Sequence, residues 1–446
     1  MMEHSVKEIR LKNGARGILV DVADAPVMTM NFSFRAGYAT ADVERWEVPH
    51  VLEHVILGAN NNFGSAREFS AELEKNGAYS NGTTDFANVT YLAECADFEW
   101  QRVLELMLGA ITMPKFLPKE IISEKANVSE EISGNVNNYF RVLGTHLAQA
   151  MGMNVLPDEQ RMKQIDSIKA SDILEHYQRT HVKENLRFII AGNVLSREKT
   201  VVGLLEKAFN KLPSGERFSL PKQQAQALNE PLVLERSGVE KLHFFIDLYA
   251  SDRDSREQVA ASVVLNTMLT GTLDSILFGE ARERGLVYSM GSGSSRGTNW
   301  SSWWLGGNVT DGNANALLKL TAKILHKVLD NDFDEARVQQ AIMREVGQFQ
   351  RSNQRVAEVA STYGGRYLFD GTIIDIDEQL DNIRAVTAAD VVAYAKRMVD
   401  ERRYGVGVLG RSAAEHAPAI FESFQAIMNR ETPRELSTPV NSKKGK

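Results

Sequence analysis

The sequence lacks the features that mark secreted, membrane-spanning or nucleic-acid-binding chains. A single cysteine, Cys95, stands among 446 residues, so no disulfide can form within the chain and a reducing compartment is compatible. No apolar run is long enough to cross a membrane, and the first residues resemble neither a signal peptide nor a transit peptide, so we expect a cytoplasmic location. A formal net charge of −7 and the lack of a basic stripe argue against general nucleic-acid binding.

The strongest chemical pattern lies in residues 48–55. On an α-helix, side chains three and four residues apart lie on one face, so His50, Glu53 and His54 would point the same way. Pro49 suits the first turn of such a helix, where its missing N–H costs nothing. Two imidazoles at this spacing can bind one zinc ion, and a carboxylate that is not a ligand can accept a proton from the attacking water. We therefore predict that both histidines bind zinc and that Glu53 is the general base.

A catalytic zinc site needs a third protein ligand, and the segment 121–132 offers two candidates. Its apolar residues recur at helical spacing, and Glu124 and Glu131 lie seven residues, or two helical turns, apart on one face. One carboxylate could bind the metal while the other orients a ligand. The plainer alternatives are a solvated acidic face here and a surface helix that carries the two histidines by chance.

The chain contains an internal duplication. Residues 170–192 and 388–410 each read as a helix followed by an apolar strand that ends in glycine. The offset between them is constant, because 390 − 172 and 410 − 192 both equal 218. A repeat of this length indicates duplicated domains rather than a solenoid. We predict a first half at 1–211, a linker at 212–229, a second half at 230–434 and a disordered tail at 435–446.

Each half is expected to combine a sheet with covering helices. Apolar strands such as residues 17–21 and 28–34 precede helical segments, and further strands follow them, which is typical of the α+β class. Adding the repeat offset of 218 to residues 50–54 of the histidine motif gives residues 268–272. None of these five residues is a histidine or a glutamate. We therefore expect one zinc site per chain, in the first half.

The histidine motif followed by Glu131, 77 residues after His54 (131 − 54), resembles the pitrilysin/insulinase family of zinc peptidases, which includes the mitochondrial processing peptidases. The order of the motif is that of the inverzincins. The resemblance implies that His50, His54 and Glu131 hold one zinc ion, with Glu124 as support and Glu53 as base. It also implies two homologous halves, each a sandwich of a mainly antiparallel sheet and helices, that face each other as bowls.

A segment between the two metal motifs resembles the family's edge strand. Residues 81–91 match its pattern of asparagine, threonine and tyrosine. In the family this strand pairs with the substrate backbone, a mode of recognition that reads peptide shape more than side-chain identity. The resemblance therefore implies that Asn81 and Gly82 contact the substrate.

A segment of the second half resembles the family's arginine/tyrosine motif. It spans residues 277–289, and the resemblance implies that Arg282 and Tyr288 reach the zinc site and hold the scissile carbonyl. The two are six residues apart (288 − 282), one fewer than is usual in the family, so Arg284 is a second candidate. An ordinary helix that ends at Gly285 is the plainer interpretation.

These observations together predict a zinc-dependent endopeptidase that cleaves unfolded or extended peptides. Chains of this family and length commonly join in pairs, so a homodimer, or a heterodimer with a related chain, is expected. Two alternatives stay open. The chain could be the metal-bearing subunit of a hetero-oligomeric peptidase that needs a partner chain, or a non-catalytic scaffold that holds peptides.

Overall fold

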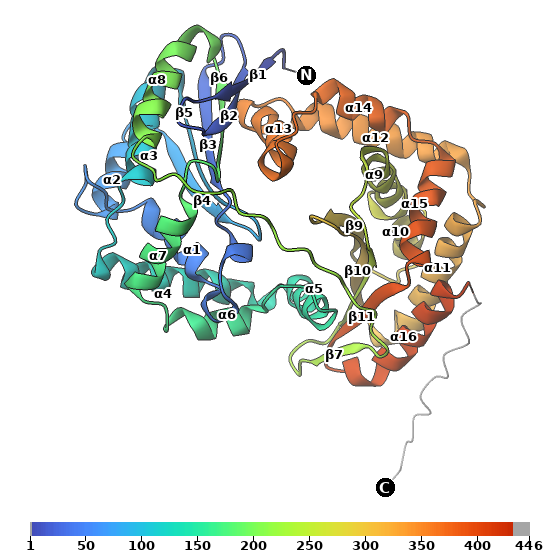
Figure 1. Cartoon of the computed structure of the whole chain (residues 1–446). Coiled ribbons are helices and arrows are strands. Elements are labelled where there is room, and N and C mark those ends of the chain that lie inside the picture. Colours follow the sequence, from blue (N-terminus) through green and yellow to red (C-terminus); the bar gives the residue numbers. More distant parts are fainter. Residues whose placement is uncertain (1, 431–446) are drawn as a thin grey trace. The chain divides into compact units, whose positions relative to one another are not determined.

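The chain folds as two compact units, each built around one β-sheet (Figure 1). The computed structural model describes residues 2–430, so the tail predicted for 435–446 lies outside the described residues. Within these residues, none of the helices combines the length and the apolar character that crossing a membrane requires. The first unit comprises the chain up to Val136, Asp158–Pro221 and Gly347–Gln379; the second comprises Asn137–Pro157, Lys222–Val346 and the chain from Leu380.

The first unit contains a six-stranded mixed sheet. Its strands are β1 (Ser5–Arg10), β2 (Arg16–Asp21), β3 (Val27–Phe34), β4 (Tyr79–Thr84), β5 (Val89–Ala96) and β6 (Leu186–Gly192). They lie in the order β1-β2-β6-β3-β5-β4, with β2 and β6 parallel and every other neighbouring pair antiparallel. Residues of β5 alternate between buried and partly buried, so one face of this strand joins the core.

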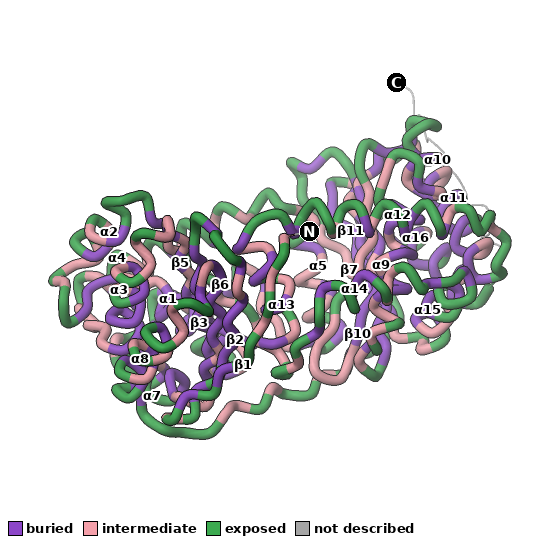
Figure 2. Tube along the Cα trace, turned by 90° about the horizontal axis from the view of Figure 1, so that it is seen from above, coloured by how far each residue is buried: buried purple, intermediate pink, exposed green. Residues whose placement is uncertain are grey.

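Helices cover both faces of this sheet. The helices of the first unit are α1 (Val48–Ile56), α2 (Ala66–Glu74), α3 (Trp100–Thr112), α4 (Pro118–Gly134), α6 (Asp158–Ile165), α7 (Ala170–Thr180), α8 (Glu198–Phe209) and α13 (Val356–Asp370); α4 packs on α1, and α6 packs on α4. Alternation along β6 sends Phe188 and Ile190 into a core with α1, α3, α7 and α8, and sends Ile189 and Ala191 into a core with α13. Strands β3 and β6 are accordingly buried along most of their length (Figure 2).

The second unit contains a five-stranded sheet. Its strands are β7 (Leu232–Glu235), β8 (Leu242–Ala250), β9 (Met290–Arg296), β10 (Ser301–Val309) and β11 (Arg403–Gly410), in the order β7-β11-β8-β10-β9. Its helices are α5 (Tyr139–Ala150), α9 (Arg256–Thr270), α10 (Phe278–Glu283), α11 (Asp311–Leu329), α15 (Ala388–Asp400) and α16 (Ala413–Met428). Helices α12 (Glu335–Ser352) and α14 (Ile376–Arg384) each cross from one unit into the other along the chain.

The two sheets share one topology. Without β1, the order β2-β6-β3-β5-β4 corresponds to β7-β11-β8-β10-β9, and each neighbouring pair has the same relative direction in both sheets. The helices before the central strands also correspond, because Asp172 of α7 and Asp390 of α15 each accept a hydrogen bond from the backbone N–H three residues earlier. The α+β class with two homologous halves is confirmed.

In each half of the repeat, one helix packs on the sheet of the other unit. Helix α5 lies between α4 and α6 in the sequence, yet it packs on β8 and β11 of the second sheet. Its counterpart α13 begins 217 residues later (356 − 139) and packs on β3 and β6 of the first sheet. Leu143 and Leu147 of α5 join Phe245 of β8 in one core. The exchange is therefore reciprocal, and neither unit is continuous in sequence.

Asp247 lies in the middle of β8, on the sheet face that α5 covers. Its neighbours on that face, Phe245 and Tyr249, belong to the core that contains α5. Burial raises the pKa of Asp247 to about 7, and the hydroxyl groups of Tyr249 and Ser302 offset only part of this effect. Its Oδ1 atom has no hydrogen-bond partner within the described chain. The folded chain therefore holds this proton more tightly than the unfolded chain does.

This buried carboxyl group makes stability depend on pH. The unfolded chain releases the proton near pH 4 and the folded chain near pH 7, so the contribution of Asp247 to the free energy of unfolding should decrease as pH rises from about 5 to about 8. Asp247→Asn should remove about 1–3 kcal/mol of this decrease. Urea denaturation of both proteins at the two pH values measures the effect. Equal pH dependences for the two proteins would contradict it.

Candidate metal centre

Helix α1 positions three of the predicted site residues. Pro49 occupies its first turn, and the apolar side chains of its inner face are fully buried in the core of the first unit. The helix packs against α4 and β4, and His50 and Glu53 are themselves only 6% exposed. Potential ligand atoms of His50, Glu53 and His54 lie within 4.8 Å of one another. The predicted spacing thus produces one compact cluster.

The two imidazoles converge on one carboxylate oxygen. Nε2 of His50 lies 3.4 Å from Oε2 of Glu131, and Nε2 of His54 lies 3.5 Å from the same oxygen. The other ring nitrogens are engaged by carboxylates, since Nδ1 of His50 donates to Glu47 and Nδ1 of His54 donates to Glu124, both at 3.1 Å. Each histidine therefore presents Nε2 to a shared point.

These distances fit a zinc ion. Zinc binds imidazole nitrogen and carboxylate oxygen at about 2.0–2.2 Å in tetrahedral geometry, which separates neighbouring ligand atoms by about 3.3–3.6 Å. Both separations between Nε2 and Oε2 fall within this range. A carboxylate behind each imidazole is also the usual support of a zinc-binding histidine. The donor set therefore suits zinc.

Strand β4 orients Glu53 within the cluster. Oε2 of Glu53 accepts a hydrogen bond from Oγ1 of Thr84 at 3.0 Å. The carboxylate lies against Gly82, where an added Cβ would come within 2.1 Å of Oε1. Burial raises the pKa of Glu53 above its ordinary value, although the charges of His50 and His54 oppose this shift. A carboxylate with increased proton affinity is suited to act as a general base.

Imidazole and carboxylate groups shift one another's protonation in this cluster. Burial disfavours the charged form of His50, but hydrogen bonds to Glu131 and Glu47 outweigh it and raise the pKa of His50 to about 9. The hydrogen bond with His50 lowers the pKa of Glu131 to about 2. At neutral pH, His50 therefore carries a proton that a zinc ion must displace. Zinc binding is expected to release protons and to weaken as pH falls.

Both carboxylates of the predicted Glu124/Glu131 pair project from α4 towards α1. Oε2 of Glu124 contacts Nδ1 of His54 and also accepts a hydrogen bond from Nδ2 of Asn127 at 3.0 Å. The Glu124 side chain is 18% exposed and that of Glu131 is 59% exposed. The more accessible carboxylate is thus the one that meets both Nε2 atoms.

Sequence reasoning missed Glu47 and Arg161, which lie behind His50. Glu47 immediately precedes α1 and is fully buried. Nε of Arg161 donates to Oε1 of Glu47 at 2.6 Å, and Nη2 donates to Oε2 at 3.1 Å. The place of Glu47 three residues before His50 is a local signal that could have identified it. Arg161 lies 114 residues from Glu47, so no local pattern points to it.

Asn81 and Gly82 lie on β4, which forms one edge of the first sheet. They pair with Leu92 and Tyr91 of β5, and no further strand of the described chain lies beyond them. Their side-chain directions alternate, so the Asn81 side chain is exposed while the Cα of Gly82 faces Glu53. The structure therefore brings Gly82 next to Glu53 of the candidate metal centre, and the backbone of Asn81 lies at the same edge of the sheet.

Arg282 and Tyr288 lie in the second unit and contact each other. Nη1 of Arg282 donates to the backbone oxygen of Tyr288 at 2.5 Å, and its guanidinium carbon lies 4.9 Å from the centre of the Tyr288 ring. Tyr288 is 73% exposed, and both residues line a cavity of about 370 Å³ together with Lys241. Arg284 instead pairs with Glu280 of its own helix at 3.3 Å. Of the two candidate arginines, Arg282 is the one that contacts Tyr288.

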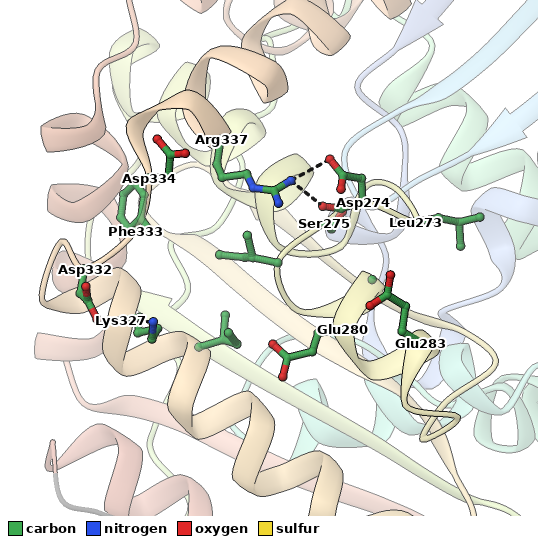
Figure 3. A pocket seen from close by; sticks show the side chains of 13 residues that line it. Leu273, Asp274, Ser275, Glu280, Glu283, Lys327, Asp332, Phe333, Asp334 and Arg337 are labelled. Carbon is green, nitrogen blue, oxygen red and sulfur yellow. Dashed lines mark hydrogen bonds and ion pairs between the residues drawn. The ribbon is translucent and has the colours of Figure 1, made fainter.

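A second cavity, of about 380 Å³, also borders α10 and is rich in carboxylates (Figure 3). Three of these are paired, because Arg337 contacts Asp274 at 2.7 Å, Lys327 contacts Asp332 at 3.5 Å and Arg284 contacts Glu280 at 3.3 Å. Its lining contains no histidine and none of the predicted site residues. The residues that line this cavity are therefore different from those of the candidate metal centre.

Two protein-family models match the chain. The model described as insulinase, peptidase family M16, matches residues 24–158, which include the two histidines and the three glutamates of the predicted site. The model described as the peptidase M16 inactive domain matches residues 167–345. Together the matched ranges cover more than half of the 446 residues. The predicted ligands His50, His54 and Glu131 all lie in the first matched range and outside the second.

Individual proteins also resemble the chain. An uncharacterized zinc protease of Streptomyces coelicolor is 24% identical over 430 residues, which cover 92% of this chain and 91% of that protein. A probable mitochondrial-processing peptidase subunit beta of Arabidopsis thaliana is 26% identical over 210 residues, 46% of this chain and 38% of that protein. The crystal structure of a protease from Helicobacter pylori has a TM-score of 0.76 at 19% identity and covers 91% of this chain and 100% of its own.

The matches to both family models, the sequence relatives and the shared fold agree with the motif around His50 and with the duplicated sheets. The chain belongs to the pitrilysin/insulinase family of peptidases, peptidase family M16.

Proposed function

We propose that this chain is a zinc-dependent endopeptidase that hydrolyses peptide bonds in unfolded or extended peptides. One observation carries the proposal: the Nε2 atoms of His50 and His54 meet a single oxygen of Glu131 at separations that suit a tetrahedral zinc ion. The similarity to a protein named as a zinc protease supports the choice of metal. One zinc ion per chain is proposed, since the equivalent helix α9 of the second unit has no histidine.

His50, His54 and Glu131 would hold the zinc ion, and the carboxylate of Glu124 orients the ring of His54. When bound there, zinc polarises the scissile carbonyl and lowers the pKa of a water molecule. Glu53 would accept a proton from the water that attacks the carbonyl carbon and would then donate this proton to the leaving amine. The hydrogen bond from Thr84 keeps the Glu53 carboxylate in the orientation that this transfer needs.

The edge of β4 receives the substrate backbone. An extended peptide that adds to this edge passes beside Glu53, because Gly82 has no side chain to separate the edge from that carboxylate. Recognition through backbone hydrogen bonds requires an extended chain, which explains a preference for unfolded segments. By the family resemblance, Arg282 and Tyr288 would hold the scissile carbonyl, and the two residues contact each other.

Replacing the base should separate metal binding from hydrolysis. Glu53→Gln keeps the size of the side chain and an oxygen that can accept from Thr84, but an amide cannot take the proton. We expect unchanged zinc content and a kcat at least about 100-fold lower. Elemental analysis and cleavage of a quenched fluorescent peptide measure the two properties. Full activity in this variant would disprove the role of Glu53.

A methyl group at residue 82 should disturb the same step. In Gly82→Ala the added Cβ collides with the Glu53 carboxylate, so the base must move while the zinc ligands stay in place. We expect kcat to fall by about 10–100-fold with normal zinc content. Thr83→Ala, whose side chain is exposed on the opposite face of β4, serves as the matched control and should retain activity. Equal activity in the two variants would contradict the close approach of Glu53 to Gly82.

The proposal as a whole is tested with a mixed pool of unstructured peptides and the purified chain alone. Mass spectrometry of the products, with and without a zinc chelator, reports cleavage and its sequence preference. We expect internal cleavage that the chelator abolishes and that added zinc restores. Cleavage that persists without zinc, or zinc binding without any cleavage, would contradict a self-sufficient zinc peptidase.

A second candidate function is that of the metal-bearing subunit in a hetero-oligomeric peptidase. The similarity to a protein named as a processing-peptidase subunit beta favours it. In that case the isolated chain binds zinc but cleaves only after a related chain is added. Size-exclusion chromatography of the isolated chain, followed by the same cleavage assay, separates a homodimer from a chain that needs a partner. A non-catalytic scaffold has less support, because His50, Glu53, His54 and Glu131 are all present.

A further inference from the structure

A buried ion pair lies directly behind one of the proposed zinc ligands. The Glu47 side chain is 0% exposed and that of Arg161 is 8% exposed. Removing two charges from water is costly, and an apolar pair of similar volume often gives equal or greater stability. Stability alone therefore does not account for this pair, and its contacts suggest a different purpose.

The contacts of Glu47 fix both its position and its plane. Nε and Nη2 of Arg161 reach Oε1 and Oε2 of Glu47 as a fork, at 2.6 and 3.1 Å. A two-point contact of this kind holds a carboxylate in one orientation. The same Oε2 atom accepts from Nδ1 of His50 at 3.1 Å. The orientation of the His50 ring is therefore tied to that of the Arg161 guanidinium.

Arg161 is itself held by further side chains. Its Nη1 donates to Asp158 at 3.0 Å, and its Nη2 donates to the hydroxyl of Tyr38 at 2.7 Å. The ring of Tyr38 is stacked on Trp46, with centres 5.3 Å apart and planes 3° apart. The chain of contacts from Trp46 to His50 thus leaves the imidazole little freedom to rotate.

The other proposed ligand has a weaker support. His54 contacts Glu124, which is partly exposed and is held by the amide of Asn127 rather than by a guanidinium. The two imidazoles therefore differ in how firmly they are oriented, although both present Nε2 to Glu131. The buried support belongs to His50 alone.

We propose that Glu47 and Arg161 are positioning residues that orient Nε2 of His50 and thereby set the zinc affinity of the site. This inference rests on the proposed zinc function. The carboxylate of Glu47 accepts the Nδ1 proton, so Nε2 is the nitrogen left to bind metal. Arg161 keeps that carboxylate from turning away, and it neutralises a charge that would otherwise be buried without a partner.

The test compares zinc affinity among variants in the full-length chain. Glu47→Gln should raise the zinc Kd, measured by competition with a chelating dye, by about 10–100-fold. It should also change the visible absorption spectrum of the cobalt-loaded chain, because the geometry of one ligand is altered. A wild-type Kd together with a wild-type cobalt spectrum would overturn the proposal.

A matched control separates positioning from general destabilisation. Asp254 in the second unit is likewise buried, and it contacts Arg397 at 2.6 Å and the hydroxyl of Tyr394 at 3.5 Å. Asp254→Asn should lower the thermal unfolding temperature and leave the zinc Kd unchanged. If it raised the zinc Kd as much as Glu47→Gln does, the role of Glu47 would be structural only.

A double variant keeps the test decisive if Glu47→Gln alone folds poorly. Glu47→Gln with Arg161→Met removes both charges at similar volume, so no unpaired charge stays buried. It should fold and show the same weaker zinc binding; a wild-type Kd in this variant would overturn the proposal. Wild-type chain that binds zinc but does not hydrolyse peptides would contradict the proposed function and leave the positioning role standing.

Discussion

The Nε2 atoms of two histidines on the buried helix α1 lie 3.4 and 3.5 Å from a single carboxylate oxygen of Glu131 on α4, and this contact defines the candidate metal centre. The apolar face of α1 lies in the core, so its polar side chains must find partners within the protein rather than in water. His50 is hydrogen-bonded to Glu47, His54 to Glu124 and Glu53 to Thr84. The contacts of the candidate metal centre thus also give the buried polar side chains of α1 their partners.

The helix of the second unit that corresponds to α1 differs from it in the residues that it buries. Helix α9 takes the place of α1 after the corresponding strand of the second sheet, and its buried residues are largely apolar. It contains no histidine, and the hydroxyl of its buried Thr267 donates to the carboxylate of Glu345. One copy of a common fold therefore carries the candidate metal chemistry, while the other carries the Arg282 and Tyr288 pair on an exposed surface. The reciprocal exchange of α5 and α13 links the two copies along the chain.

Much of this arrangement could be predicted from sequence, because the relevant spacing lies within single helices. Residues three or four apart on α1, and seven apart on α4, must share a face, whatever the rest of the chain does. The family resemblance and the α+β class follow from the same motif and from the repeat, and both are confirmed. The contact between Arg161 and Glu47 joins residues far apart in sequence, so it emerges only from packing. The exchange of α5 and α13 was not anticipated for the same reason.

The most direct test of the account is the identity of the atoms that bind zinc. Anomalous X-ray diffraction from zinc-loaded crystals, collected on both sides of the zinc absorption edge, locates the ion and its ligands. The account predicts one zinc ion per chain, bound by Nε2 of His50, Nε2 of His54 and a carboxylate oxygen of Glu131 at about 2.0–2.2 Å. Zinc bound by Glu53 in place of Glu131, or no zinc between these helices, would contradict it.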